Sequence, residues 1–380
     1  MLDLAVVALL VGATVGVLLF QGVAILFAEE MPRLDPTPPI PSDPPRPRVT
    51  VVIAARNEAE ELPATLDALL AQDYPELEIL VVEDGSTDRT VEVIGARAPR
   101  VRCLHPPPLP EGWIGKSWAC WNGANAASGG WLLFLDADVR LHSSTIQTTI
   151  DWAVREGADL ATIAPRIEMV GFWERVVLPF YVQTVLTYLR APRINHDRSR
   201  AAMANGQYWL TPRATYFALG GHAAVRSIVL EDVAIAKRYR AAGRRLRIAW
   251  TPQLAVTRMY RNRAEMFEGL LKNIHGTEYS LARQASFLVG LAGLFLLPLG
   301  LLPFALVVGN LLLAVLGAFV YVALFGKHYA FARAVGAPGA YGLLFPVAVA
   351  YYLGLVGTSL ARGLRRRPVA WKGRTYPLRR

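Results

Sequence analysis

The feature that most limits the fold of this chain is an apolar run from Trp131 to Val139 that carries two aspartates near its end. A short apolar run bounded by Gly129-Gly130 and by charge predicts a buried strand, with Asp136 and Asp138 at its carboxyl end. Ligands bind at that edge of an open α/β sheet. Both carboxylates are expected to face one crevice, because alternate side chains of an extended segment point the same way. Carboxylate oxygens suit Mg2+ or Mn2+, while a turn with two solvated aspartates is the local alternative.

Two earlier segments also place polar residues at predicted strand ends. Arg48 to Ala55 is rich in β-branched residues and is followed by a helical pattern, and Glu78 to Val82 predicts a second strand with Asp84 just after it. A strand, a helix and a second strand in this order predict a parallel sheet and an α/β fold. Asp84 is then expected at the same sheet edge as Asp136, although an aspartate that caps a helix is the local alternative.

Apolar segments at both ends of the chain are long enough to cross a bilayer. Leu4 to Phe27 forms one such segment, Ser286 to Phe325 is nearly uncharged and has room for two closely apposed spans, and Tyr341 to Ala361 forms another. Only 18% of the residues are charged, which fits a chain that lies partly in lipid. An uncleaved N-terminal anchor is expected rather than a signal peptide, because no basic segment precedes the first span.

The formal net charge of +10 lies at the C-terminal end of the chain. From Ser286 onward there is no Asp or Glu, whereas ten Lys and Arg residues occur there. A nucleic-acid-binding protein would carry its excess charge on the folded domain, so no nucleic-acid partner is expected; basic residues that flank apolar spans suit anionic lipid headgroups. Cys103 and Cys120 lack the spacing of a metal site and fit a reducing compartment.

These patterns predict five parts. They are an N-terminal transmembrane anchor (1–28), a proline-rich linker (29–47), an α/β domain (48–285), a C-terminal transmembrane region of two or three spans (286–361) and a basic tail (362–380). Basic residues after the first span predict a multi-pass protein of the cell membrane with the α/β domain in the cytoplasm. Three C-terminal spans would place the basic tail outside the cell, although basic residues favour the cytoplasmic side. Two spans would keep the tail inside. The sequence leaves both numbers of spans open.

Four motifs in order resemble the signature of the family 2 glycosyltransferases, which have the Rossmann-like GT-A fold. They are Val51 to Glu58, Val82 to Asp88, the Gly115-Lys116 segment and Phe134 to Asp138. The segment Pro107 to Ala119, together with membrane spans at both ends, further resembles hopanoid-associated and carotenoid glycosyltransferases of bacteria. The resemblance covers about Arg48 to Asn273.

The resemblance implies a site for a nucleoside diphosphate sugar, expected to be a UDP-sugar. Asp84 would contact uracil or ribose, Asp136 would hold ribose or a metal-bound water, and Asp138 would ligate the Mg2+ or Mn2+ on the diphosphate. The remaining residues implied to line the nucleotide pocket are Ala54, Arg56, Glu58 and Lys116, of which Arg56 and Lys116 are candidate contacts to phosphate or base. Lys116 as a solvated helix residue is the alternative.

The resemblance also implies the acceptor side of the site. Inverting sugar transfer needs one base for the acceptor proton. In the family the Asp of a Glu-Asp pair does this, so Asp232 is the implied base and Glu231 its neighbour on the acceptor side. Acidic pairs at helix starts also occur as partners of the helix dipole, which is the local alternative.

A lipid acceptor of polyprenyl, hopanoid or carotenoid type is expected. Phe172 to Arg190 is predicted to be an amphipathic helix at the membrane surface, with a buried core helix as the alternative. Asn205 to Tyr208 and Ala218 to His222 would form an acceptor wall or pack in the core. The Gln-x-x-Arg-Trp pattern of processive relatives is absent, which favours a single transfer over polysaccharide synthesis. A nucleotidyltransferase would carry a Gly-rich basic loop near the first strand, and a non-catalytic nucleotide-binding membrane scaffold would not need three acidic sites.

Overall fold

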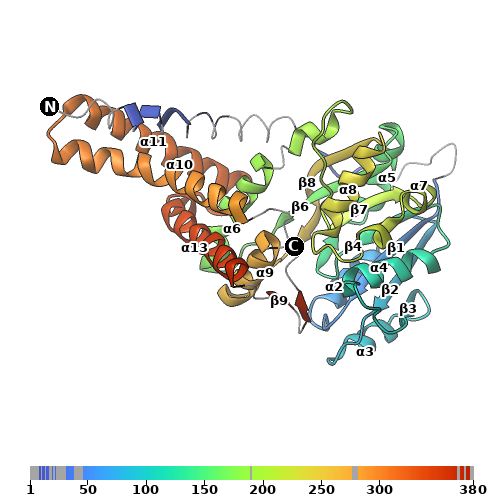
Figure 1. Ribbon diagram of the computed structural model, residues 1–380. Helices are drawn as coiled ribbons and strands as arrows, with labels where there is room; N and C mark the ends of the chain where they lie inside the picture. The colour runs from blue at the N-terminus through green and yellow to red at the C-terminus, as the bar shows by residue number, and fades with distance from the viewer. Residues whose placement is uncertain are drawn as a thin grey trace. The chain divides into compact units, whose positions relative to one another are not determined.

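The computed structural model describes residues 31–37, 46–188, 191–275, 281–365, 369–371 and 374–376, with scattered residues between 8 and 22 (Figure 1). The chain divides into two compact units. An α/β unit comprises Glu30–Glu168 and Leu189–Met259. A helical unit comprises Met1–Glu29, Met169–Tyr188 and Tyr260–Arg380, so two helices that lie inside the predicted domain 48–285 group instead with the apolar helices. Each unit is described by itself.

The α/β unit is built on one eight-stranded sheet of order β3-β2-β1-β4-β7-β6-β8-β5. The strands are β1 Val49–Ala55, β2 Leu77–Glu83, β3 Val101–Leu104, β4 Trp131–Leu135, β5 Val139–Leu141, β6 Leu160–Ile167, β7 Tyr208–Pro212 and β8 Leu246–Thr257. Strands β3, β2, β1 and β4 are parallel, β7 runs antiparallel to β4 and β6, and β5 runs antiparallel to β8. The expected α/β fold is confirmed, and the sheet changes from parallel to mixed next to β4.

Helices cover both faces of this sheet (Figure 1). They are α2 Leu62–Leu70, α3 Thr90–Gly95, α4 Gly115–Ala126, α5 Thr145–Arg155, α7 Arg213–Ala218 and α8 Glu231–Ala241, with short 3-10 turns η1 Ala191–Asn195 and η2 Gly221–Val225. On one face Val51 and Leu133 are fully buried in a core shared with Leu66 of α2. On the other face α4 lies so close that a Cβ on Gly123 would be 2.4 Å from Val52 Cγ1. Each large apolar side chain buried in this way contributes about 1.5 to 3 kcal/mol to stability.

A buried carboxylate ties the starts of the parallel strands together. Glu78 of β2 accepts hydrogen bonds from Thr50 Oγ1 at 2.6 Å, Ser128 Oγ at 2.7 Å and Arg102 Nη1 at 2.7 Å. Burial alone would raise the pKa of Glu78, but these donors outweigh it and lower the pKa to about 2. The amino ends of the strands are thus fixed by charge and hydrogen bonds, and the opposite edge is left for loops.

The proline-rich segment lies against the α/β unit at both of its described ends. The Leu34 amide donates to the Trp250 carbonyl at 3.2 Å, and Thr37 Oγ1 lies 2.8 Å from Thr148 Oγ1. Arg46 pairs with Asp151 at 2.7 Å. These described residues are attached to the domain rather than extending from it as a free spacer.

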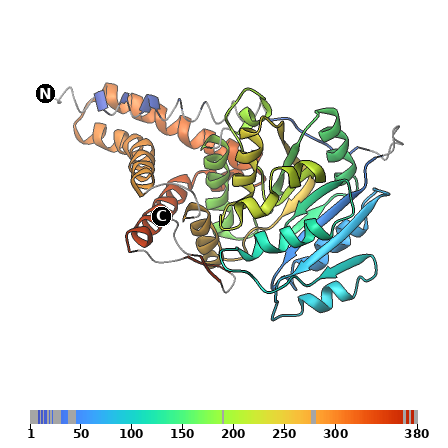
Figure 2. The ribbon, with the colours of Figure 1, turned by 45° about the vertical axis from the view of Figure 1, so that its right-hand side comes forward.

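The helical unit contains α6 Phe172–Tyr188, α9 Arg263–His275, α10 Leu281–Val307, α11 Leu311–Ala334, α12 Gly339–Gly342 and α13 Phe345–Leu364, with a hairpin of β9 Val369–Trp371 and β10 Arg374–Tyr376 (Figure 2). Among the described residues, α10, α11 and α13 are long and apolar enough to cross a membrane. The turn between α10 and α11 uses Gly309 at φ 67°, and Asn310 caps α11 by accepting from the Leu313 amide at 3.0 Å. Most of the predicted N-terminal span lies outside the described residues.

The predicted surface role of Phe172 to Arg190 is wrong for most of the described helix. In α6, Val177 and Leu178 are fully buried, and Phe180 packs against Phe295 and Tyr352. Among the described side chains of α6, Phe172 alone is classed as exposed, at 50%. Because its side chains pack against other helices of the helical unit, α6 is a core helix of that unit.

Candidate active site

Asp136, Ala137 and Asp138 form a turn between two strands. The predicted strand Trp131 to Val139 ends at Leu135, and Val139 begins β5. Ala137 and Val139 point into the core, and Thr65 Oγ1 donates to the Ala137 carbonyl at 2.7 Å. Asp136 and Asp138 are only partly buried. The two aspartates therefore share one side, as the alternation predicts, but they do so in a turn that a core alanine anchors.

The loops that follow β1 and β2 are fastened to each other at the same edge. The Asp84 amide donates to the Ala55 carbonyl at 2.9 Å, and Arg56 Nη1 donates to the Asp84 carbonyl at 3.3 Å. Asn57 has a left-handed φ of 54°, and its Oδ1 accepts from the Thr87 amide at 2.8 Å. Because β1 pairs with both β2 and β4 in parallel, these loops and the Asp136 turn lie at neighbouring strand ends.

Four of the predicted pocket residues fall on or beside these loops. Ala54 is the sixth residue of β1, opposite Val82 of β2, and the Glu58 amide donates to Thr90 Oγ1 at 2.8 Å. The structure thus brings Ala54, Arg56, Glu58 and Asp84 to one edge. Their contacts to a nucleotide stay predictions.

Lys116 links the Asp136 turn to the Glu231-Asp232 pair. Its Nζ lies 2.7 Å from Asp136 Oδ1 and 3.1 Å from Glu231 Oε1. Lys116 stands in the first turn of α4, and Glu231, which is buried, opens α8. Burial disfavours the charged ammonium, but the two carboxylates outweigh it and raise the pKa of Lys116. One cation therefore holds together two motifs that are far apart in the sequence.

Asp232 is held by backbone amides. The Gly206 amide donates to Oδ2 at 2.7 Å, and the Val233 amide donates to Oδ1 at 2.7 Å. Burial and the neighbouring Glu231 raise the pKa of Asp232 to about 6, against the opposing effects of Lys116 and the two amides. A carboxylate of this kind can take a proton from a hydroxyl near neutral pH.

Asp138 is supported from β8. Thr257 Oγ1, which is buried, donates to Asp138 Oδ2 at 3.3 Å, next to the pairing of Val139 with Thr257. No group of three or more His, Cys, Asp or Glu side chains suited to a metal occurs among the described residues. Mg2+ and Mn2+ are often bound by one or two carboxylates, with phosphate and water completing the shell. The partly buried carboxylates of Asp136 and Asp138 at this sheet edge fit this kind of binding.

Of the two alternatives for Ala218 to His222, an acceptor wall or core packing, the structure places His222 in the core. This side chain is buried, and its Nδ1 lies 2.7 Å from Tyr216 Oη. Its ring contacts those of Phe134 and Trp209, so it belongs to the core beneath β4 and β7. Burial lowers the pKa of His222 to about 3, which keeps the ring neutral.

The sequence does not predict the contacts of Gly206 with Asp232 and of Thr257 with Asp138. A glycine between Asn205 and Gln207 signals a turn, which is the one local indication for Gly206. Thr257 carries no local signal, because its contact depends on the register between β5 and β8.

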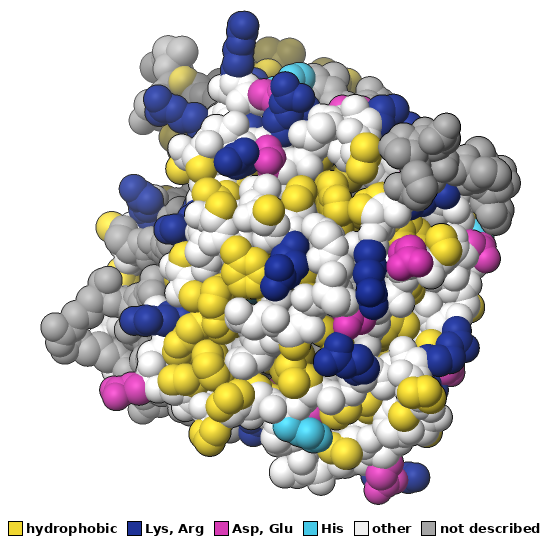
Figure 3. All heavy atoms as spheres, turned by 90° about the vertical axis from the view of Figure 1, so that its right-hand side faces the viewer, with side chains coloured by type: hydrophobic (Ala, Val, Ile, Leu, Met, Phe, Trp, Pro, Cys, Tyr) yellow, Lys and Arg dark blue, Asp and Glu magenta, His cyan; other side chains and the backbone are white. Residues whose placement is uncertain are grey.

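Surface charge on the face drawn in Figure 3 is mixed. Lys and Arg side chains there are scattered among hydrophobic and acidic side chains. They do not gather into one basic stripe on that face.

Known proteins share this domain. Residues 50–225 match the model described as glycosyl transferase family 2. The 4,4'-diaponeurosporenoate glycosyltransferase of Staphylococcus aureus (strain USA300) is 29% identical over 194 residues, which are 50% of this chain and 51% of that protein. The protein of the same name from Staphylococcus haemolyticus (strain JCSC1435) is 27% identical over 194 residues, again 50% and 51% of the two chains. The match thus spans about half the length of these curated relatives.

A solved structure shares the fold of most of the chain. The mannosyltransferase PcManGT from Pyrobaculum calidifontis, solved in complex with GDP-Man and Mn2+, superposes with a TM-score of 0.54 at 19% identity, over 94% of this chain and 97% of that chain. The likeness at this identity shows the fold alone. The fold is the Rossmann-like GT-A fold expected from the sequence, and the match of residues 50–225 to the glycosyl transferase family 2 model bears out the expected resemblance to that family.

Proposed function

We propose that this chain transfers one sugar from a nucleoside diphosphate sugar to a hydroxyl or carboxyl group of a membrane lipid, with inversion and with a divalent cation. The observation that carries the proposal is the Lys116 bridge, which joins Asp136 on the donor side to Glu231 beside Asp232. A donor motif and a candidate base thereby share one site.

On the donor side, the loops after β1 and β2 would hold the nucleotide, with Arg56 and Asp84 as its contacts and a UDP-sugar as the expected donor. Asp138 would hold Mg2+ or Mn2+, and Asp136 would hold ribose or a metal-bound water. The cation would offset charge that develops on the leaving diphosphate. A donor diphosphate would also compete with Asp136 and Glu231 for the ammonium of Lys116.

On the acceptor side, Asp232 would act as the base. The acceptor oxygen forms a bond to the anomeric carbon as the bond from that carbon to the diphosphate breaks, and the hydroxyl proton passes to the Asp232 carboxylate. Attack opposite the leaving group inverts the configuration. The pKa of about 6 leaves Asp232 ionised at neutral pH and able to receive the proton.

A lipid acceptor is supported by the helical unit and by the relatives. Helices α10, α11 and α13 are each long and apolar enough to span a bilayer. The relatives are named as glycosyltransferases of 4,4'-diaponeurosporenoate. The proposed arrangement is a multi-pass cell-membrane protein with an N-terminal anchor, a cytoplasmic catalytic domain and a basic tail.

The experiment is to incubate membranes that contain the protein with a panel of labelled nucleotide sugars and to extract the lipids. Labelled lipid carrying one sugar, dependent on Mg2+ or Mn2+, is the expected result. Polymeric label would contradict a single transfer, and label confined to the aqueous phase would contradict the lipid acceptor. Membranes containing Asp232→Asn are the matched control.

A further inference from the structure

The turn Asn205 to Gln207 touches both halves of the candidate site. On one side the Gly206 amide donates to Asp232 Oδ2 at 2.7 Å. On the other side the Gln207 carbonyl accepts from the Asp136 amide at 3.2 Å. Three consecutive residues therefore connect the Asp136 turn to Asp232 through backbone groups.

The turn is itself fixed to β6. The Asn205 amide donates to Thr162 Oγ1 at 2.9 Å, and Asn205 Nδ2 donates to the Ile163 carbonyl at 3.1 Å. Within the turn, Asn205 Oδ1 accepts from the Gln207 amide at 3.2 Å. A segment held by so many hydrogen bonds keeps its shape when a neighbouring group moves.

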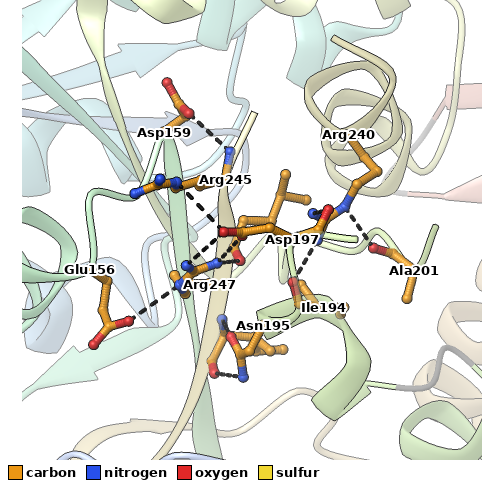
Figure 4. Close-up of polar contacts among 11 residues, drawn as sticks. Glu156, Asp159, Ile194, Asn195, Asp197, Ala201, Arg240, Arg245 and Arg247 are labelled. Atoms are coloured by element: carbon orange, nitrogen blue, oxygen red, sulfur yellow. Dashed lines mark hydrogen bonds and ion pairs between the residues drawn. The ribbon is translucent and has the colours of Figure 1, made fainter. Parts of the chain in front are cut away.

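The chain that leads into this turn is fastened as well (Figure 4). Arg247 of β8 pairs with Asp197 at 2.7 Å, and Asn195 exchanges hydrogen bonds with both backbone groups of Ile248. Arg240 of α8 donates to the carbonyls of Ile194 and Ala201. Residues 191–201 are thus tied to β8 and to the helix that carries Asp232.

Gly206 stands where a side chain would occupy the site. A Cβ at this position would lie 2.9 Å from Asp232 Oδ2 and 3.4 Å from Lys116 Nζ. Its φ is not left-handed, so an alanine would be resisted by these two side chains and not by its own backbone. The backbone can approach the Asp232 carboxylate this closely because this residue has no Cβ.

We infer that Gly206 is a positioning residue, which aims the Asp232 carboxylate through its amide and keeps clear the space in which the acceptor hydroxyl meets that carboxylate. This inference rests on the proposed function. It gives the Asn205–Gln207 turn the task of orienting the Asp232 carboxylate, where the sequence left an acceptor wall and core packing as alternatives.

The test compares Gly206→Ala with Gly130→Ala in lipid glycosylation. Gly130 lies beside β4, has no left-handed φ and has open space around its Cβ position, so its alanine variant is the matched control. Displacement of a reacting group by about 1 Å can cost on the order of a hundredfold in rate. Gly206→Ala is expected to lower kcat at least tenfold with an unchanged KM for the nucleotide sugar, whereas Gly130→Ala stays within twofold of the parent.

A pH profile separates positioning from general damage. A weakened amide contact favours the protonated carboxyl, so the acid limb of kcat for Gly206→Ala should move to higher pH; the charged groups that face Asp232 are Glu231 of α8 and Lys116 of α4. An unchanged profile with near-parental kcat would overturn the inference. If Gly206→Ala fails to fold, Asn205→Ala replaces it in the test, because this variant removes the side-chain hydrogen bonds of the turn. The acid limb of kcat should then move to higher pH for Asn205→Ala as well. An unmoved limb in that variant would also overturn the inference. A parent without sugar transfer would refute the proposed function instead.

Discussion

Asp136 and Asp232 are carboxylates of one site that are held in different ways. Asp136 is paired with the full positive charge of Lys116 at 2.7 Å. Asp232 receives two backbone amides and lies beside the like charge of Glu231. Burial and a like charge raise the pKa of Asp232, which suits a group that exchanges a proton near neutral pH. The difference in partners agrees with the proposed roles, in which Asp136 serves the donor and Asp232 takes the acceptor proton.

The largest effect on turnover is expected in the Asp136 turn, at Asp138. Asp138→Asn should lower turnover on the order of a thousandfold, because a metal supplies several kcal/mol of charge stabilisation to the leaving group. Asparagine keeps an oxygen for the Thr257 hydroxyl, so folding should be retained. Turnover measured across an Mg2+ and Mn2+ titration checks this. Near-normal activity of the variant in excess chelator would show that Asp138 holds no metal.

The next effect concerns the base. Asp232→Asn should lose roughly a hundredfold or more in turnover, the usual contribution of a positioned base, with donor affinity nearly unchanged. Calorimetry with the nucleotide sugar measures the affinity separately. Asp67→Asn, at an exposed salt bridge, is the control. Loss of turnover and affinity together would place Asp232 in the donor pocket and erase the contrast with Asp136.

The pH dependence should follow the same group. Since the pKa of Asp232 is raised to about 6, kcat should be level above that pH and fall about tenfold per unit below it, as the carboxylate takes up a proton. Rates measured from pH 4.5 to 8 would reveal this limb. The residual kcat of Asp232→Asn should show no such fall at low pH. If kcat of this variant still falls below pH 6, a group other than Asp232 causes the fall.

The smallest effect is on stability. The folded-state pKa of Asp232 lies above the usual value of 3.8, so the folded chain holds the proton more tightly, and stability falls as pH rises from about 4 through 6. Asp232→Asn should therefore be more stable than the parent at pH 8, by about 1 kcal/mol once partial exposure is allowed for, and equal to it at pH 4. Thermal unfolding in detergent at both pH values measures this. A variant less stable at pH 8 would mean that the amide contacts outweigh the like charge.

The strand ends could be predicted from sequence because their signals are local. Apolar runs with a carboxylate at the end placed Asp84 and Asp136 at one sheet edge, and the helix that begins at Glu231 follows from an acidic pair before a helical pattern. These elements can be recognised from a few neighbouring residues, without knowing which strand pairs with which.

Contacts that cross the fold could not be predicted in this way. The support of Asp138 by Thr257 depends on the register of β5 against β8, and the Gly206 contact depends on a long connection fixed by Arg240 and Arg247. Helix α6 was misjudged for another reason: apolar side chains nearly all round suit a lipid surface and a protein core alike, and only its packing partners distinguish them.

The strand order determines at which point of synthesis the candidate active site can be complete. Strands β4 and β5 are neighbours in the chain, yet β7, β6 and β8 lie between them in the sheet. Asp138 and its partner Thr257 are 119 residues apart. The loops after β1 and β2 belong to the first part of the domain to be synthesised, but the turn Asp136 to Asp138 acquires its support from Thr257 only after β8 has left the ribosome. Because a domain generally folds as a unit, a nascent or truncated chain that stops before Leu246 carries both aspartates without the strand that supports the second.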